Sequence, residues 1–182
     1  MCLMLFVLEQ QSITAVDSPA WIYVGLIVFI NTIILPVSLI WMLKRQKIIQ
    51  SMSLHRREER IYPFFITAVF YFTTWYVFKS IQVLPFLSLI FIISMVLVMA
   101  AATISLLWKI SIHSMSMGAI SMAVLYLTLA HYIPSPWPVY TLIFLSGWVA
   151  FSRLKLQAHT AAQVYGGYLL GGLLTAFVFV IA

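Results

Sequence analysis

The feature that most constrains the fold is a series of long apolar stretches with almost no charge inside them. A helix needs about 20 mostly apolar residues to cross a bilayer. Of the 182 residues, 64% are hydrophobic and 8% are charged, whereas a soluble domain carries about 25% charged residues. These proportions exclude an ordinary soluble enzyme, a disordered chain and a coiled coil. They predict an all-α fold, a polytopic membrane helical bundle.

Six apolar stretches are candidate spans, the fourth of them short, so we predict about six transmembrane helices. They cover residues 21–43, 61–78, about 83–108, about 118–133, about 139–151 and about 161–182. The turn from Pro134 to Pro138 separates the fourth from the fifth, because proline lacks an N–H donor and fixes φ. Residues 1–20 are expected to be a peripheral N-terminal segment. Irregular backbone cannot face lipid, so residues 1–182 are predicted to form a single integral membrane domain with its core in residues 21–182.

Acidic residues are confined to the first third of the chain. They are Glu9, Asp17, Glu58 and Glu59, and none follows Arg60. Their absence excludes paired-carboxylate catalysis in the remaining two-thirds and argues against a Mg or Ca site there. One cysteine allows no disulfide framework or thiolate metal site within the chain. We therefore expect no metal and no cofactor.

Basic residues gather on one face of the expected bundle. If the chain crosses the membrane six times, the loops 44–60, 109–117 and 152–160 lie on the same side. Nine of the ten basic residues fall in these loops, and Lys79 alone falls on the other side. The positive-inside rule therefore predicts that the basic face is cytoplasmic. The net charge of +6 is attributed to this topology, and no nucleic-acid partner is expected.

Three short motifs combine histidine and basic residues on that face. Their candidate residues are Arg57 and Arg60 in the first motif, Lys109, Ser111 and His113 in the second, and Ser152, Arg153, His159 and Gln163 in the third. Arginine presents a planar fork of donors that suits phosphate oxygens. Histidine can act as a nucleophile or a general acid near neutral pH. A site of this composition favours an anion, and at a membrane surface the natural anion is a lipid phosphate.

At these residues the chain resembles the type 2 phosphatidic acid phosphatase (PAP2) superfamily of membrane lipid phosphatases. That family has a basic first motif ending in Arg-Pro, then Pro-Ser-Gly-His, then Ser-Arg, five residues, His, three residues and Asp. The third motif is matched by Ser152, Arg153 and His159, and the second by Ser111 and His113, while Arg57, Arg60 and Pro63 give a looser first motif. The resemblance covers roughly residues 44 to 175. It extends to a divergent, Bacteroidota-like branch, which implies a bacterial inner membrane.

The resemblance also implies the role of each residue. His159 would attack phosphorus and form a phosphohistidine, and His113 would protonate the leaving alkoxide. The phosphoryl oxygens would be held by Arg153, Arg57, Arg60, Lys109, Ser111 and Ser152. Gln163 replaces the family's third-motif Asp, so it would orient His159 through its carbonyl without adding charge. The substrate would be an anionic lipid phosphate taken from the surrounding membrane lipids, and no metal would take part.

Each of these assignments has a purely structural alternative. His159 and His113 could be interfacial or helix-end residues, and Arg57 and Arg60 could anchor a loop at anionic headgroups. The replacement by Gln163 favours a second reading, a non-catalytic relative that binds a lipid phosphate or a protein partner. A transporter or channel is disfavoured, because no span carries a central charged residue.

Overall fold

The computed structural model describes residues 18–47, 57–81 and 85–181. Within these ranges the chain is helical apart from short connections and contains no strand, which confirms the all-α prediction for them. Five described helices are long and apolar enough to cross a membrane, namely Ile22–Arg45, Ile61–Ser80, Leu87–Leu107, Ile112–Leu129 and Ala161–Ile181. At most 28% of any of these spans is buried inside the protein, so their apolar surface faces outward. The chain is therefore an integral membrane protein.

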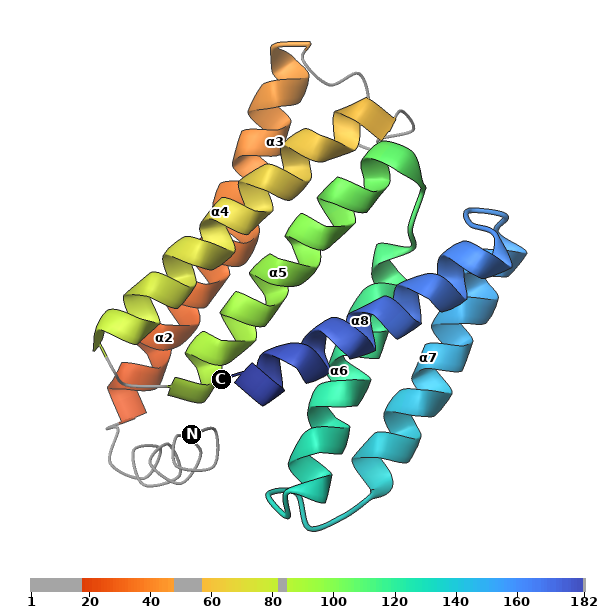
Figure 1. Cartoon of the computed structure of the whole chain (residues 1–182). Helices are drawn as coiled ribbons and strands as arrows, with labels where there is room; N and C mark the ends of the chain where they lie inside the picture. The colour runs from red at the N-terminus through yellow and green to blue at the C-terminus, as the bar shows by residue number, and fades with distance from the viewer. Residues whose placement is uncertain (1–17, 48–56, 82–84, 182) are drawn as a thin grey trace. The chain divides into compact units, whose positions relative to one another are not determined.

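The helices fall into two compact units, residues 1–106 and 107–182. The first unit holds α2 (Ser18–Phe29), η1 (Ile30–Ile34), α3 (Leu35–Arg45), α4 (Arg57–Ile81) and most of α5 (Pro85–Leu107), as labelled in Figure 1. Its core is built from Val24, Phe78 and Phe91. The rings of Phe78 and Phe91 have centroids 5.8 Å apart. This aromatic cluster holds α2, α4 and α5 together within the unit.

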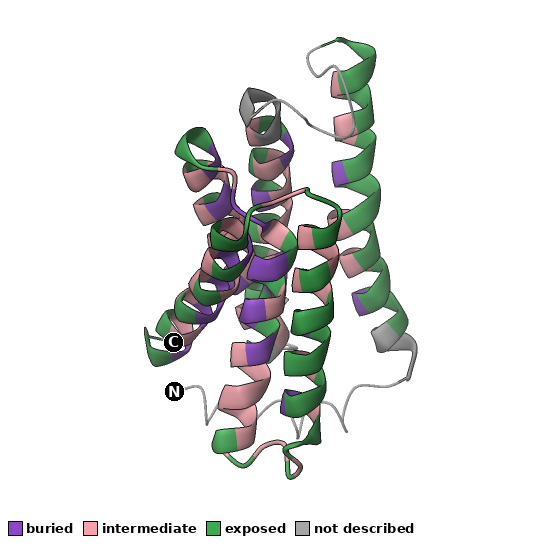
Figure 2. Ribbon diagram, turned by 90° about the vertical axis from the view of Figure 1, so that its right-hand side faces the viewer, coloured by how far each residue is buried: buried purple, intermediate pink, exposed green. Residues whose placement is uncertain are grey.

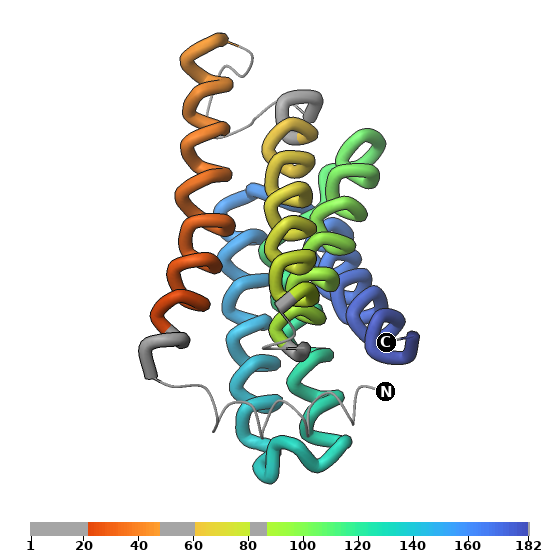
Figure 3. The backbone as a smooth tube through the Cα atoms, turned by 90° about the vertical axis from the view of Figure 1, so that its left-hand side faces the viewer, coloured from red at the N-terminus to blue at the C-terminus, as the bar shows by residue number. Residues whose placement is uncertain are grey.

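A π-helical turn lies in the middle of the first span. The tube in Figure 3 runs through α2, η1 and α3 without a break. Pro36 opens α3, and a proline ring clashes with the carbonyl four residues earlier, here that of Thr32. The wider turn relieves this clash, and the Leu35 N–H donates to the carbonyl of Ile30 instead. The predicted span over residues 21–43 is therefore one continuous helix with a local widening.

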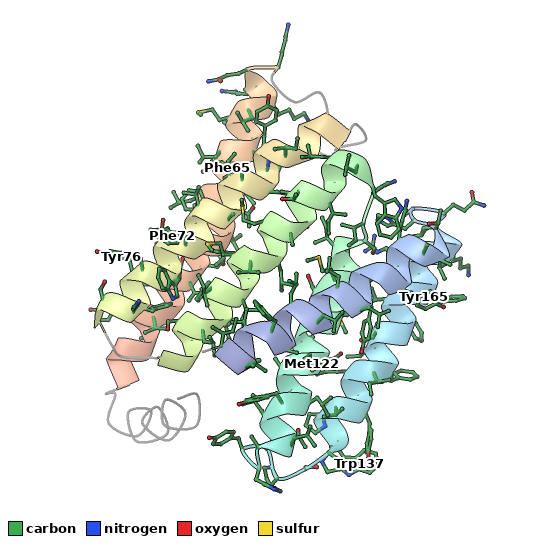
Figure 4. All side chains as sticks on the ribbon, viewed as in Figure 1. Phe65, Phe72, Tyr76, Met122, Trp137 and Tyr165 are labelled. Carbon is green, nitrogen blue, oxygen red and sulfur yellow. The ribbon has the colours of Figure 1, made fainter. Side chains whose placement is uncertain are left out.

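The outward face of α4 is aromatic. Phe65, Phe72 and Tyr76 project from one side of the helix in Figure 4 and are 59%, 46% and 60% exposed. Spacings of seven and four residues place them on one helix face. An exposed apolar face of this length is suited to contact with lipid.

The second unit contains α6 (Ile112–Leu129), α7 (Trp137–Lys155) and α8 (Ala161–Ile181), and α8 crosses α6 in Figure 1. Glycines allow this crossing to be very close. A Cβ atom on Gly171 would overlap the carbonyl oxygen of Met115, and one on Gly118 would overlap that of Tyr168. The carbonyls therefore approach within the reach of weak Cα–H···O contacts. Gly167 and Gly171 therefore lie on the face of α8 that packs against α6.

The fourth predicted span has different ends in the structure. We predicted residues 118–133, but α6 begins at Ile112 and ends at Leu129. It begins early because Ser111 is its N-cap, with a side chain that accepts from the Ser114 N–H. The predicted loop 109–117 is therefore wrong, and the second motif lies at the start of a helix.

The fifth predicted span, residues 139–151, lies within α7. This helix has 19 residues, about 28 Å of length, but it is not among the five apolar spans. Tyrosine, tryptophan and the basic pair near its C-terminus make it less apolar than the others. Most of α7 is exposed in Figure 2, and one exposed face is entirely aromatic, formed by Trp137, Tyr140, Phe144, Trp148 and Phe151. Its opposite face packs on α6, where the Ser121 and Ser146 hydroxyl oxygens lie 3.4 Å apart.

Two further predictions concern the N-terminal segment and the number of domains. The expected peripheral segment, residues 1–20, lies outside the described residues except for its last three, which begin α2. The single integral membrane domain stays a prediction, and the two units are described separately below.

Candidate anion site

The third motif spans the end of α7 and the start of α8. Arg153 lies in the last turn of α7, and the chain then reverses through Gln157, which has a φ of 50°. The Ala158 N–H donates to the Arg153 carbonyl over 3.1 Å, and the Gln157 N–H donates to the Leu154 carbonyl over 2.9 Å. This pair of bonds is a Schellman motif. The turn therefore explains the Ser-Arg-x5-His spacing, because it sets the position of His159 relative to Arg153 at the end of α7.

A capping box begins α8. The Gln163 N–H donates to the Thr160 hydroxyl over 3.4 Å, and the Thr160 N–H donates to Gln163 Oε1 over 3.1 Å. This reciprocal pair satisfies two N–H groups that a helix terminus would otherwise leave unpaired. Gln163 Oε1 also lies 3.2 Å from Nδ1 of His159. The contact predicted between Gln163 and His159 is confirmed, and Gln163 has a second role that we did not predict.

The second motif meets the third through the backbone. The Ser111 N–H donates to the Gln163 carbonyl over 3.2 Å, which joins the N-cap of α6 to the first turn of α8. Gly167 lies close to the same junction, since a Cβ there would come 2.7 Å from the Ser111 carbonyl oxygen. Two segments that are about 50 residues apart in the sequence are thereby held in fixed register.

The side chain of Arg153 contains a buried nitrogen without a described partner. Its Nε is buried and, among the described residues, has no hydrogen-bond partner. The charge of Arg153 also acts on the imidazole of His113, an exposed residue in the first turn of α6. Residues 107–182 contain Lys109, Arg153 and Lys155 but no Asp or Glu. A buried donor on a cation is costly to leave unpaired, so this arrangement favours an anion beside Arg153.

Two predicted phosphate ligands have structural tasks instead. Ser111 is fully buried, and its hydroxyl oxygen lies 3.0 Å from that of Ser114. The Ser152 hydroxyl donates to the Trp148 carbonyl over 2.9 Å. Both side chains serve helix ends or helix carbonyls, which is common for serine. We therefore leave their hydroxyls out of the proposed anion contacts.

Three predicted site residues remain, namely Lys109, Arg57 and Arg60. Lys109 is half-buried in the connection before Ser111. Arg57 and Arg60 belong to the first turns of α4 in the first unit, and their side chains are outside the described residues. The structure thus brings together the second and third motifs, and the joining of the first motif to them stays a prediction.

Thr160 is a residue of this site that we did not predict from the sequence. The pattern Thr-x-x-Gln directly before an apolar run is the sequence signature of a capping box, so a signal was present at Thr160 and Gln163.

In the comparisons with known proteins, no family model, no curated protein and no solved structure matches the chain.

Proposed function

We propose that this protein is a membrane lipid phosphatase, which hydrolyses a phosphomonoester or diphosphate group on a membrane lipid. The observation that carries the proposal is the buried, unpartnered Nε of Arg153, which interacts electrostatically with His113 in a unit without carboxylates. An anion would satisfy this nitrogen and also balance the charge of the guanidinium. Within a membrane, the phosphate group of a lipid supplies that anion, and the resemblance to type 2 phosphatidic acid phosphatases supports the same choice.

In the proposed reaction, a ring nitrogen of His159 forms a bond to phosphorus while the bond from phosphorus to the ester oxygen breaks. His113 gives a proton to that oxygen. Water then attacks the phosphohistidine, His113 takes up a proton from the water, and inorganic phosphate leaves. Arg153 stabilises the charge on the phosphoryl oxygens through both steps. Arg57, Arg60 and Lys109 are proposed as further contacts to these oxygens.

One observation favours a second candidate function. Gln163 contacts His159 but carries no charge, so it stabilises a cationic imidazole less than an Asp would. The second candidate is therefore a protein that binds a lipid phosphate at Arg153 without hydrolysing it. The two candidates share the anion site and differ only in turnover.

Replacing Arg153 by Met should separate anion binding from folding. The substitution removes a buried nitrogen that has no hydrogen-bond partner among the described residues, so the variant should melt at the same or a higher temperature than the wild type in phosphate-free buffer. Inorganic phosphate and dioleoyl phosphatidate should each raise the melting temperature of the wild type but not that of Arg153→Met. The matched control is Lys155→Met, which removes an exposed cation two residues away and should keep the response.

The same purified proteins should be assayed for phosphate release from phosphatidate, phosphatidylglycerophosphate and a polyprenyl diphosphate. Release by the wild type and Lys155→Met, but not by Arg153→Met, supports the phosphatase. Binding without release supports the second candidate. An equal response of all three proteins to phosphate would contradict an anion site at Arg153.

We further propose six crossings, with α7 as the fifth, in a bacterial inner membrane with the site facing the cytoplasm. The exposed aromatic face of α7 would then lie against lipid. A cysteine introduced at Gln46, after Cys2 is replaced by Ser, should resist an impermeant thiol reagent in intact cells and react after permeabilisation. A cysteine at Ser80, beyond the basic residue of the opposite face, is the reciprocal control and should react in both. The reverse pattern would place the basic face outside the cytoplasm.

A further inference from the structure

The hydrogen bonds around Gln163 determine which way its side-chain amide faces. A backbone N–H can only donate, and that of Thr160 lies 3.1 Å from the Gln163 side chain. The amide atom at this position must therefore be the carbonyl oxygen, since the NH₂ group could not accept. The usual ambiguity between the oxygen and nitrogen of a glutamine is removed here by the capping box.

The orientation of the amide in turn determines the protonation of His159. Nδ1 of the imidazole lies 3.2 Å from the same oxygen. Oxygen offers only lone pairs, so Nδ1 must carry the hydrogen that makes this bond. In the neutral ring the remaining lone pair is then on Nε2, which makes Nε2 the nucleophilic nitrogen.

Two hydrogen bonds join Thr160 to Gln163, and one of them reaches the side-chain amide. The Thr160 N–H donates to Gln163 Oε1 and orients the amide, while the Thr160 hydroxyl accepts from the backbone N–H of Gln163 and fixes the first turn of α8 that carries this side chain. The carbonyl of Gln163 is fixed separately by the Ser111 N–H. The residue before α8 is thus connected through one glutamine to the imidazole and to the second motif.

We propose that Thr160 is a positioning residue, whose capping box with Gln163 fixes His159 in the tautomer that is protonated on Nδ1 and presents the Nε2 lone pair to phosphorus. The part that concerns phosphorus rests on the proposed function. The tautomer is inferred from the contact between Nδ1 and Gln163 Oε1 and not from the reaction, so the two can be tested separately.

The test is nitrogen NMR of the full chain in lipid nanodiscs with ¹⁵N-labelled histidine, in which the two neutral tautomers have distinct ring signals. The His159 signal is assigned by its loss in His159→Ala, and the pH is set high enough to keep the ring neutral. The wild type should show Nδ1 protonated. Thr160→Val keeps the shape of the side chain and the backbone N–H but removes the hydroxyl that accepts from the Gln163 backbone N–H. The first turn of α8 should then fray and loosen the Gln163 side chain, which should give a mixture of tautomers. Thr160→Ser restores the cap and should restore the wild-type signal.

Two further variants keep the test decisive. Gln163→Leu removes the acceptor and should shift His159 toward protonation on Nε2, even if Thr160→Val is too poorly folded to study. Thr141→Val is the matched control, since the Thr141 hydroxyl donates to a carbonyl within α7, that of Trp137, and its loss should leave the His159 signal unchanged. In turnover assays, Thr160→Val should lower kcat in proportion to the fraction of His159 that leaves the tautomer protonated on Nδ1. Its KM should not change, because Arg153 still binds the phosphate.

A wild-type His159 protonated on Nε2, or a tautomer that responds to neither Thr160→Val nor Gln163→Leu, would overturn the positioning role. If the tautomer responds as expected but the wild type hydrolyses no lipid phosphate, the positioning role stands and the proposed hydrolysis fails.

Discussion

The His159→Ala variant should release no phosphate from lipid phosphates, with turnover at least on the order of 10³-fold below the wild type. The reason is that the alanine side chain offers no nitrogen to attack phosphorus, and loss of a nucleophile removes most of the rate enhancement of a covalent mechanism. Binding of the substrate should be nearly unchanged, since the proposed contact of Arg153 with the phosphate is left intact. The measurement is phosphate release together with the melting-temperature response to phosphatidate.

The covalent intermediate gives an independent check on this prediction. Brief incubation with a ³²P-labelled lipid phosphate should leave an acid-labile label on the wild type and none on His159→Ala. The matched control is His131→Asn. His131 is exposed at the end of α6 with a φ of 62°, and asparagine tolerates this left-handed conformation. Its turnover should equal that of the wild type. Full turnover in His159→Ala would remove this mechanism whatever the labelling shows.

The Gly171→Ala variant should lower the free energy of unfolding by about 3 kcal/mol, at the upper end of the range for overpacked cores. The added methyl group would overlap the Met115 carbonyl, which is backbone and cannot rotate away. The only escape is separation of α8 from α6, which also breaks the hydrogen bond from Ser111 to Gln163. Unfolding in mixed micelles, followed by circular dichroism, measures the loss.

Gly147→Ala provides a control with the opposite sign. Gly147 lies in α7 with no atom within 4 Å of an added Cβ. Alanine is the better helix former by about 1 kcal/mol, so this variant should be more stable than the wild type. Equal effects of the two substitutions would mean that α6 and α8 do not pack through Gly171.

Much of the fold follows from the sequence, because a span in a bilayer needs only length and apolar composition. Five of the six predicted stretches are both long enough and apolar enough to span a bilayer. The α7 helix is long enough but not apolar enough, since tryptophan, tyrosine and basic residues lower its hydropathy. Apolar composition alone places the start of the fourth span near residue 118, whereas α6 begins at Ile112, because Ser111 before the apolar run is an N-cap.

The candidate site was predictable from the sequence only where its residues are close together in the chain. A spacing of four residues puts His159 and Gln163 within reach across the start of a helix, so their contact could be expected. The burial of Ser111 and the unpartnered Nε of Arg153 depend on how α6, α7 and α8 pack. Packing of that kind cannot be deduced from spacing, because it is decided by contacts between residues distant in the chain.

The shared use of Gln163 Oε1 has a consequence for how the protein could change over time. This one atom serves both the start of α8 and the ring of His159. A mutation that removes this oxygen weakens the start of α8 and at the same time frees the ring of His159. Stability of the helix and orientation of the histidine therefore change together at this position. Glutamate is the one replacement that keeps the capping box while adding charge. We therefore expect a selection experiment that starts from random codons at position 163 to recover mainly glutamine and glutamate.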